Sequence, residues 1–237
     1  QGIAEWLPIS SSGHLVVFQH LFGLKGGVSF DIFLHLSSLF VIIIFFHRDI
    51  VKLCKALFSF DRKSYEFNLG LYIIYGSIVT GVIGIFLSHY IERLAIMKVM
   101  PFTFFITSVL LFLSTRKSSG ELDTKKALFI GLMQGLALLP GVSRSGATIS
   151  AAKIAGVKNE EAFRFSFLLA IPAILGAVIL EVKEFQAIPV SYLLTGLFTS
   201  FFVGMASLYL LKNIVVKDKI YLFGFYTLTV AIVVAVL

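Results

Sequence analysis

The sequence predicts an all-α polytopic membrane protein that forms a single integral membrane domain over residues 1–237. Hydrophobic residues make up 58% of the chain and charged residues only 14%, whereas soluble domains carry about 25% charged residues. Several apolar segments run for about 17 to 22 residues, which is enough to cross a hydrocarbon core about 30 Å thick. The short alternating segments of a membrane β-barrel do not occur.

Six apolar segments are the candidate membrane spans, and an α-helix is expected for each because lipid offers no partner to exposed backbone groups. Pro172 lies inside the fourth segment and is expected to bend it. The chain starts at Gln1 without an initiator methionine, so residues of the natural N-terminus are expected to be missing. The predicted spans are 30–46, 69–88, 99–114, 160–180, 190–211 and 220–237.

Two further regions, 1–22 and 127–156, each contain two short apolar halves separated by Pro, Gly and Ser. Each half is too short to cross a bilayer, and a broken backbone at membrane depth must be buried in protein or line a wet cavity. We therefore expect two re-entrant helix–loop–helix hairpins. In the first, a helical turn would place Gln1 and Glu5 on one face.

The two hairpins resemble each other in sequence. The stretch QGIAEWLPISSSGH begins at Gln1, and QGLALLPGVSRSGA begins at Gln134. Both begin Gln-Gly-x-Ala, pass through Leu-Pro and end Ser-x-Ser-Gly, with a one-residue gap near the proline. They predict an internal repeat, with repeat 1 at about residues 1–114 and repeat 2 at about residues 127–237.

The distribution of basic residues predicts how the chain is oriented. Loops after the first, third and fifth spans carry most of the Lys and Arg, whereas loops after the second and fourth carry only Arg93, Lys98 and Lys183. Basic loops lie mainly in the cytoplasm. The first hairpin then enters from outside and the second from the cytoplasm. Such inverted repeats place a polar site near the midplane, here expected to face the extracytoplasmic side of the cytoplasmic membrane.

The two hairpin tips carry the candidate site residues. The guanidinium of Arg144 offers a planar fork of donors that suits phosphate oxygens, and a helix beginning near Thr148 would add backbone donors. Glu5 would repel a phosphate unless a cation lay between them, and an all-oxygen set suits Mg²⁺ or Ca²⁺. His14 could act as a general base or acid with a serine as nucleophile. Further candidate phosphate ligands are Ser10, Ser143, Ser145 and Thr148.

These motifs resemble those of the undecaprenyl-diphosphate phosphatases of the bacitracin-resistance type. The family pattern Glu/Gln-x-x-x-Glu with Pro-x-Ser-Ser-x-Gly-His matches residues 1–14, and Pro-Gly-x-Ser-Arg-Ser-Gly-x-Thr matches residues 140–148. The resemblance extends over essentially the whole chain. It implies six spans with two re-entrant hairpins, a divalent cation, and removal of the terminal phosphate of a polyprenyl diphosphate. By residue, it implies metal binding at Gln1 and Glu5, catalysis at Ser11 and His14, and phosphate binding at Ser143, Arg144 and Thr148. Many members carry Glu where this chain has Gln1, which would weaken metal binding.

Other interpretations of the same residues remain open. Arg144 could bond carbonyls at a broken helix end, His14 could be a buried structural histidine, and Ser12 and Ser145 could serve helix packing. Asp31 and His35 could pair with each other or border the site. The choice between Ser11 and His14 as nucleophile is left open.

A transporter or flippase for phosphate or for the polyprenyl phosphate carrier is the alternative function, because inverted repeats with broken helices are a transporter architecture. The net charge of +7 fits basic cytoplasmic loops rather than a nucleic-acid partner. The single Cys54 excludes an intrachain disulfide and a cysteine-based metal cluster. The expected partners are the lipid substrate and the bilayer, and a homo-oligomer is left open.

Overall fold

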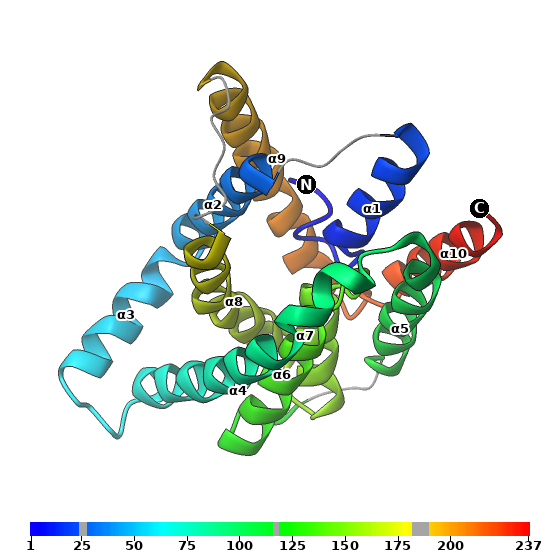
Figure 1. Ribbon diagram of the computed structural model, residues 1–237. Helices are drawn as coiled ribbons and strands as arrows, with labels where there is room; N and C mark the ends of the chain where they lie inside the picture. Colours follow the sequence, from blue (N-terminus) through cyan, green and yellow to red (C-terminus); the bar gives the residue numbers. More distant parts are fainter. Residues whose placement is uncertain (24–27, 116–118, 182–189) are drawn as a thin grey trace.

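The computed structural model describes residues 1–23, 28–115, 119–181 and 190–237 (Figure 1). Within these ranges the chain folds into ten α-helices and one short 3-10 helix, η1. The helices are α1 (Ser11–Phe22), α2 (Val28–Phe45), α3 (His47–Phe58), α4 (Tyr65–Leu94), η1 (Met97–Val99), α5 (Met100–Leu113), α6 (Thr124–Leu136), α7 (Arg144–Ile154), α8 (Asn159–Glu181), α9 (Val190–Val216) and α10 (Leu222–Val236).

Each of the six predicted spans coincides with one helix, namely α2, α4, α5, α8, α9 or α10. Three of them, α4, α8 and α9, are long and apolar enough to cross a membrane, and α2 with α3 forms a bent fourth candidate. The helices α5 and α10 are apolar but have only 14 and 15 residues. The all-α, multi-pass class is thus confirmed, whereas six complete crossings stay a prediction.

Helix α3 lies in a segment for which the sequence predicts a loop. It leaves α2 at an angle of 77°. Leu53 and Ala56 are buried, while Arg48, Lys52 and Lys55 are exposed. The chain therefore forms an amphipathic helix here, because one helical face can bury apolar groups while the other keeps its charges in water.

The long helices pack in pairs, with α4 against α6, α5 against α10, and α2 against α8 and α9 (Figure 1). Small residues allow the closest crossing. A Cβ added to Gly131 on α6 would lie 2.5 Å from the carbonyl oxygen of Gly76 on α4. Thr80 on α4 donates its hydroxyl to the carbonyl oxygen of Gly131 at 2.9 Å. Close helix contact through small residues, with hydroxyls bonded across the crossing, is typical of membrane bundles.

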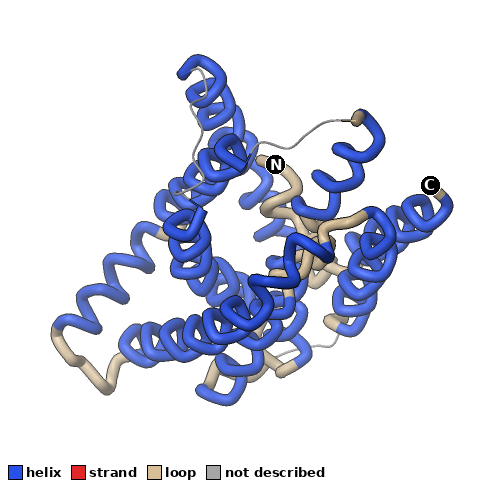
Figure 2. The backbone as a smooth tube through the Cα atoms, viewed as in Figure 1, coloured by secondary structure: helices blue, strands red, loops and turns tan. Residues whose placement is uncertain are grey.

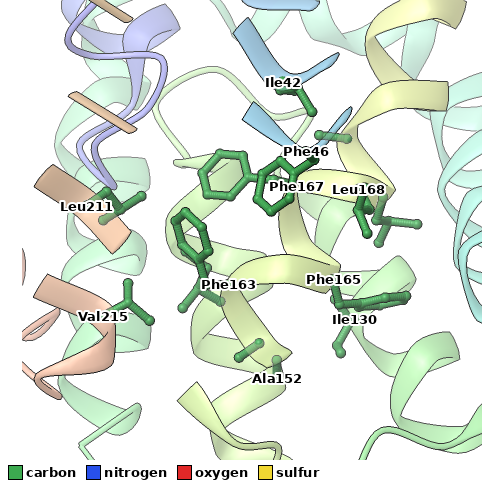
Figure 3. Packing of buried hydrophobic residues seen from close by; sticks show 14 of the residues in the cluster. Ile42, Phe46, Ile130, Ala152, Phe163, Phe165, Phe167, Leu168, Leu211 and Val215 are labelled. Carbon is green, nitrogen blue, oxygen red and sulfur yellow. The ribbon is translucent and has the colours of Figure 1, made fainter. Parts of the chain in front are cut away.

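Helix α8 supplies much of the buried core. Its Phe163, Phe165 and Phe167 are almost fully buried, and Phe163 and Phe167 pack with Phe46 from the end of α2 (Figure 3). In contrast, many large apolar side chains of α4, α9 and α10 are exposed. This distribution places α8 inside the bundle and leaves apolar faces of the other helices for lipid.

The two predicted hairpins differ in their first halves. The second has the expected form, since α6 ends at Leu136 and α7 begins at Arg144. In the first hairpin, residues 2–9 form consecutive turns instead of the expected short helix. Glu5 still donates its backbone N–H to the carbonyl oxygen of Gln1 at 2.9 Å, and Leu7 donates to that of Ile3 at 3.1 Å, so α-type turns form here. A longer helix is blocked because Pro8 lacks a backbone N–H and disfavours the helical conformation of the residue before it.

Candidate active site

The helices α1 and α7 begin with the same capping arrangement. The Ser10 hydroxyl accepts a hydrogen bond from the backbone N–H of Gly13 at 3.2 Å, and the Ser143 hydroxyl accepts one from Gly146 at 3.1 Å. A serine N-cap satisfies backbone donors that the first helical turn leaves free. Helix α7 therefore begins at Arg144, whereas the sequence predicted that it would begin near Thr148.

The loop at the start of the chain and the loop between α6 and α7 lie close to each other in the middle of the bundle (Figure 2). The backbone N–H of Gly141 donates to the Ser12 hydroxyl at 3.4 Å, and the Ser145 hydroxyl donates to the carbonyl oxygen of Trp6 at 3.1 Å. These bonds join the two tips directly. Ser12 and Ser145 thus hold the two tips together in this structure, and phosphate binding by Ser145 stays a prediction.

The first residues of α1 and α7 converge on one carboxylate. Ser11 donates its hydroxyl to Oε2 of Glu5 at 2.7 Å, and Arg144 donates Nη2 to Oε1 of Glu5 at 3.1 Å. The side chains of Arg144 and Glu5 are only 16% and 11% exposed. The fold therefore brings three of the predicted site residues into one hydrogen-bonded cluster, although Arg144 and Glu5 are 139 positions apart.

Arg144 keeps one donor group unused. Its Nη1 atom is buried and has no hydrogen-bond partner among the described residues. The guanidinium also lies 5.8 Å from the ring centre of Phe167, within the range of a cation–π contact. A buried donor without a partner is costly. This nitrogen is therefore a candidate donor to an oxygen of a bound ligand.

His14 does not bond to Ser11 in this structure. Its Nδ1 lies 2.8 Å from the carbonyl oxygen of Ser10, and its Nε2 lies 2.9 Å from the hydroxyl of Tyr226 on α10. The partner of the Ser11 hydroxyl is Glu5 instead. Tyr226 was not found from the sequence, since nothing in an apolar segment 212 positions away marks it as a neighbour of His14.

The remaining hydroxyl of the second tip is used inside the protein. Thr148 donates to the carbonyl oxygen of Arg144 at 2.8 Å and shares a hydrogen bond with Ser166 on α8. Both hydroxyls are buried. In this structure Thr148 supports the first turn of α7, and through it the position of Arg144.

Comparison with known proteins identifies the family. The protein-family model described as "Bacitracin resistance protein BacA" matches residues 1–233. The chain therefore belongs to the BacA family. Curated relatives named "Undecaprenyl-diphosphatase" include one from Thermosipho melanesiensis, 40% identical over 237 residues, and one from Korarchaeum cryptofilum, 38% identical over 245 residues; each alignment covers 98% of this chain and 93% of the relative. A Bacillus cereus protein named "Undecaprenyl-diphosphatase 1" is 39% identical over 250 residues. The resemblance inferred from the two motifs is confirmed.

A divalent cation in this BacA-family site would have few protein ligands. Among the described residues, no group of three or more His, Cys, Asp or Glu side chains could hold a metal. Glu5 supplies one carboxylate, and Gln1 lies one turn before it. One carboxylate with substrate phosphates and water is a usual set for Mg²⁺, so the residues fit a metal that binds together with the diphosphate. The side chain of Asp31 lies outside the described residues, so both its pairing with His35 and a place for the two beside the site stay predictions.

Proposed function

We propose that this protein is an integral membrane phosphatase that hydrolyses undecaprenyl diphosphate to undecaprenyl phosphate and inorganic phosphate. This reaction would recycle the lipid carrier for cell-wall synthesis. The relatives that carry the name undecaprenyl-diphosphatase support this substrate. The observation that carries the proposal is the convergence of Ser11 and Arg144 on Glu5, because it joins a nucleophile, a base and a phosphate-binding cation.

Ser11 is the nucleophile in this proposal, and Glu5 is its general base. As Ser11 Oγ forms a bond to the terminal phosphorus, its proton moves to Oε2 of Glu5, and the bond between that phosphorus and the bridging oxygen breaks. The lipid monophosphate leaves. Water then attacks the phosphoserine, the proton on Glu5 returns to Ser11 Oγ, and the proton lost by the water departs with inorganic phosphate. The 2.7 Å hydrogen bond from Ser11 to Glu5 supports this assignment over a histidine nucleophile.

Arg144 binds the transferring phosphoryl group. One of its terminal nitrogens holds Glu5, and the other is buried without a partner among the described residues. A guanidinium can therefore fix the base and contact a phosphate oxygen simultaneously. Its fixed donors stabilise the charge that develops on the phosphoryl oxygens in the transition state. Backbone N–H groups at the starts of α1 and α7 add partial positive charge on the same side.

Gln1 and Glu5 would hold a divalent cation, Mg²⁺ or Ca²⁺, that arrives with the substrate. When bound, the cation would neutralise the charge of the diphosphate and so reduce its repulsion from Glu5. Gln1 contributes an amide oxygen and no charge, which favours weak metal binding.

A transporter of phosphate or of the polyprenyl phosphate carrier is the less favoured function. A carrier needs donors such as Arg144, but it has no use for a hydroxyl bonded to a buried carboxylate. The Ser11–Glu5 hydrogen bond therefore favours hydrolysis.

For the topology, we propose six crossings with two re-entrant hairpins and a site open to the extracytoplasmic side of the cytoplasmic membrane. The distribution of basic loops supports an extracytoplasmic position of the first hairpin, and this hairpin carries Glu5 and Ser11. A multiply charged headgroup cannot cross hydrocarbon to reach its site. The headgroup would therefore enter from outside while the isoprenoid tail stays in lipid.

The direct test is phosphate release from a C55 polyprenyl diphosphate by the purified protein in detergent. Ser11→Ala should abolish release, because no nucleophile remains next to Glu5. Ser77→Ala is the matched control, since the Ser77 hydroxyl donates only to a carbonyl of its own helix, at 2.6 Å. Full activity of Ser11→Ala would refute the nucleophile, and no phosphate release by the wild-type protein would refute the function.

A further inference from the structure

His14 is held at both ring nitrogens and on two sides of its ring. The carbonyl oxygen of Ser10 can only accept, so Nδ1 at 2.8 Å must donate to it. In the neutral ring Nε2 is then the acceptor, and the Tyr226 hydroxyl at 2.9 Å donates to it. The rings of His14 and Tyr226 stack with centroids 5.7 Å apart, and the ring of Phe104 stands nearly perpendicular to that of His14 with centroids 5.2 Å apart. These contacts select one tautomer and one orientation of the imidazole.

The imidazole of His14 is bonded to Ser10, a residue with a strained backbone. Ser10 has φ of 67°, in the left-handed region that residues with a side chain rarely adopt. Its carbonyl oxygen accepts both the backbone N–H of His14 at 3.2 Å and the His14 side chain. Such a conformation persists only where its surroundings enforce it. Ser10 directly precedes Ser11, so the orientation of its peptide unit sets where the Ser11 hydroxyl points.

We infer that Tyr226 is a positioning residue, which acts through His14 and the Ser10 carbonyl to aim the Ser11 hydroxyl at Glu5. This inference rests on the proposed function, since it assigns Ser11 as the nucleophile. Tyr226 belongs to α10, which packs against α5. Its phenol therefore links the end of the chain to the first hairpin. The same contact gives His14 a supporting role in which neither ring nitrogen has to receive the proton of Ser11.

The kinetic test is Tyr226→Phe, which removes one oxygen atom and keeps the stacked ring. Loss of one neutral hydrogen bond should lower kcat about 3- to 10-fold. The KM for the polyprenyl diphosphate should not change, because a positioning residue acts on His14 and not on the headgroup. Tyr226→Leu, which also removes the ring, should lower kcat further. Tyr209→Phe is the matched control, since Tyr209 is an exposed tyrosine on α9 whose ring packs on Phe45.

The spectroscopic test does not depend on activity. The protein contains five histidines, and imidazole ¹⁵N labelling with a His14→Gln comparison identifies the signals of His14. We expect a protonated Nδ1 and an unprotonated, hydrogen-bonded Nε2. In Tyr226→Phe the Nε2 signal should move toward that of a free unprotonated nitrogen, and in Tyr209→Phe it should stay in place.

Several results would overturn the inference. A wild-type spectrum with a protonated Nε2 would remove the proposed hydrogen bond, even if Tyr226→Phe failed to fold. Unchanged kcat in a folded Tyr226→Phe would show that the contact does not act on Ser11. A raised KM with unchanged kcat would make Tyr226 a substrate contact instead. If the wild-type protein released no phosphate, the proposed function would fail, while the ¹⁵N spectrum would still decide whether Tyr226 holds His14.

Discussion

Replacing Arg144 by lysine separates its charge from its fork of donors. Lysine keeps a positive charge near Glu5, but its side chain has a single nitrogen. Arg144 uses one terminal nitrogen to bond Glu5 and leaves the second one for the substrate. A lysine ammonium cannot reproduce that planar, two-pronged geometry. We therefore expect Arg144→Lys to lose nearly as much turnover as Arg144→Ala.

The expected size of the loss follows from the contacts of Arg144. Removing one fixed donor to a developing anion typically costs about 10²- to 10³-fold in kcat, so both variants should fall by this amount. Their stabilities should differ. The pair is mostly buried, with exposures of 16% and 11%, and removing one partner of a buried pair costs about 3–5 kcal/mol. Arg144→Ala should therefore lose stability on this scale, whereas Arg144→Lys should retain most of it.

Two assays on the same samples separate these effects. Phosphate release over a range of substrate concentrations gives kcat and KM. Thermal unfolding followed by tryptophan fluorescence reports on the site, because Trp6 is the only tryptophan and is fully buried beside Glu5. Arg164→Lys is the control, since Arg164 also forms an ion pair, with Asp49 at 2.6 Å, but lies outside the cluster. Near-full activity of Arg144→Lys would show that Arg144 is only a point charge, and the phosphate clamp would be wrong.

Three further predictions concern the metal, the orientation and the loop before α7. EDTA should abolish phosphate release and Mg²⁺ or Ca²⁺ should restore it. Glu5→Gln should stay inactive even with excess metal, because it loses both the carboxylate ligand and the base for Ser11. Equal activity of the wild-type protein in EDTA would remove the metal from the mechanism. A membrane-impermeant thiol reagent should label the exposed Cys54 only in inverted vesicles. In a Cys54→Ala background, the same reagent should label Ser12→Cys in intact cells. The reverse pattern would place the site on the cytoplasmic side. Gly141→Ala should lower the Tm and the activity more than Gly156→Ala. Both glycines have positive φ, so an alanine costs about 1–2 kcal/mol at either position, but only at Gly141 would the new Cβ also collide with a threonine. Equal losses would show that this tight contact is unimportant.

The sequence by itself determined the class of the protein and the composition of its site. Backbone groups in hydrocarbon must be bonded within their own segment, so six long apolar runs could only become helices, and each did. The two Pro-, Gly- and Ser-rich interruptions marked where the backbone would break. The residues Gln-x-x-x-Glu and Ser-Arg-Ser also marked the family, since their types and spacing are read directly from the chain.

Local sequence patterns predicted secondary structure less reliably in two segments, residues 47–58 and the first half of the first hairpin. Residues 47–58 carry enough charge to read as a loop, but the burial of Leu53 and Ala56 against the bundle stabilises helix α3. The first hairpin was expected to open with a helix, whereas Pro8 and the contacts of Trp6 with the second tip hold it in turns. Tertiary packing therefore favoured the helix at residues 47–58, whereas in the first hairpin the local effect of Pro8 acted together with the contact to the second tip.

Only the tertiary structure decided which side chains act together. Ser11 and His14 are neighbours in the sequence, yet Ser11 bonds to Glu5 while His14 turns to Ser10 and Tyr226. Hydropathy and capping act over a few residues, and they therefore fix helices and breaks. Contacts over 139 and 212 positions depend on how whole helices pack, because a rotation of one helix changes the partner of every side chain on it. The Glu5 cluster and its support from α10 are for that reason properties of the folded bundle.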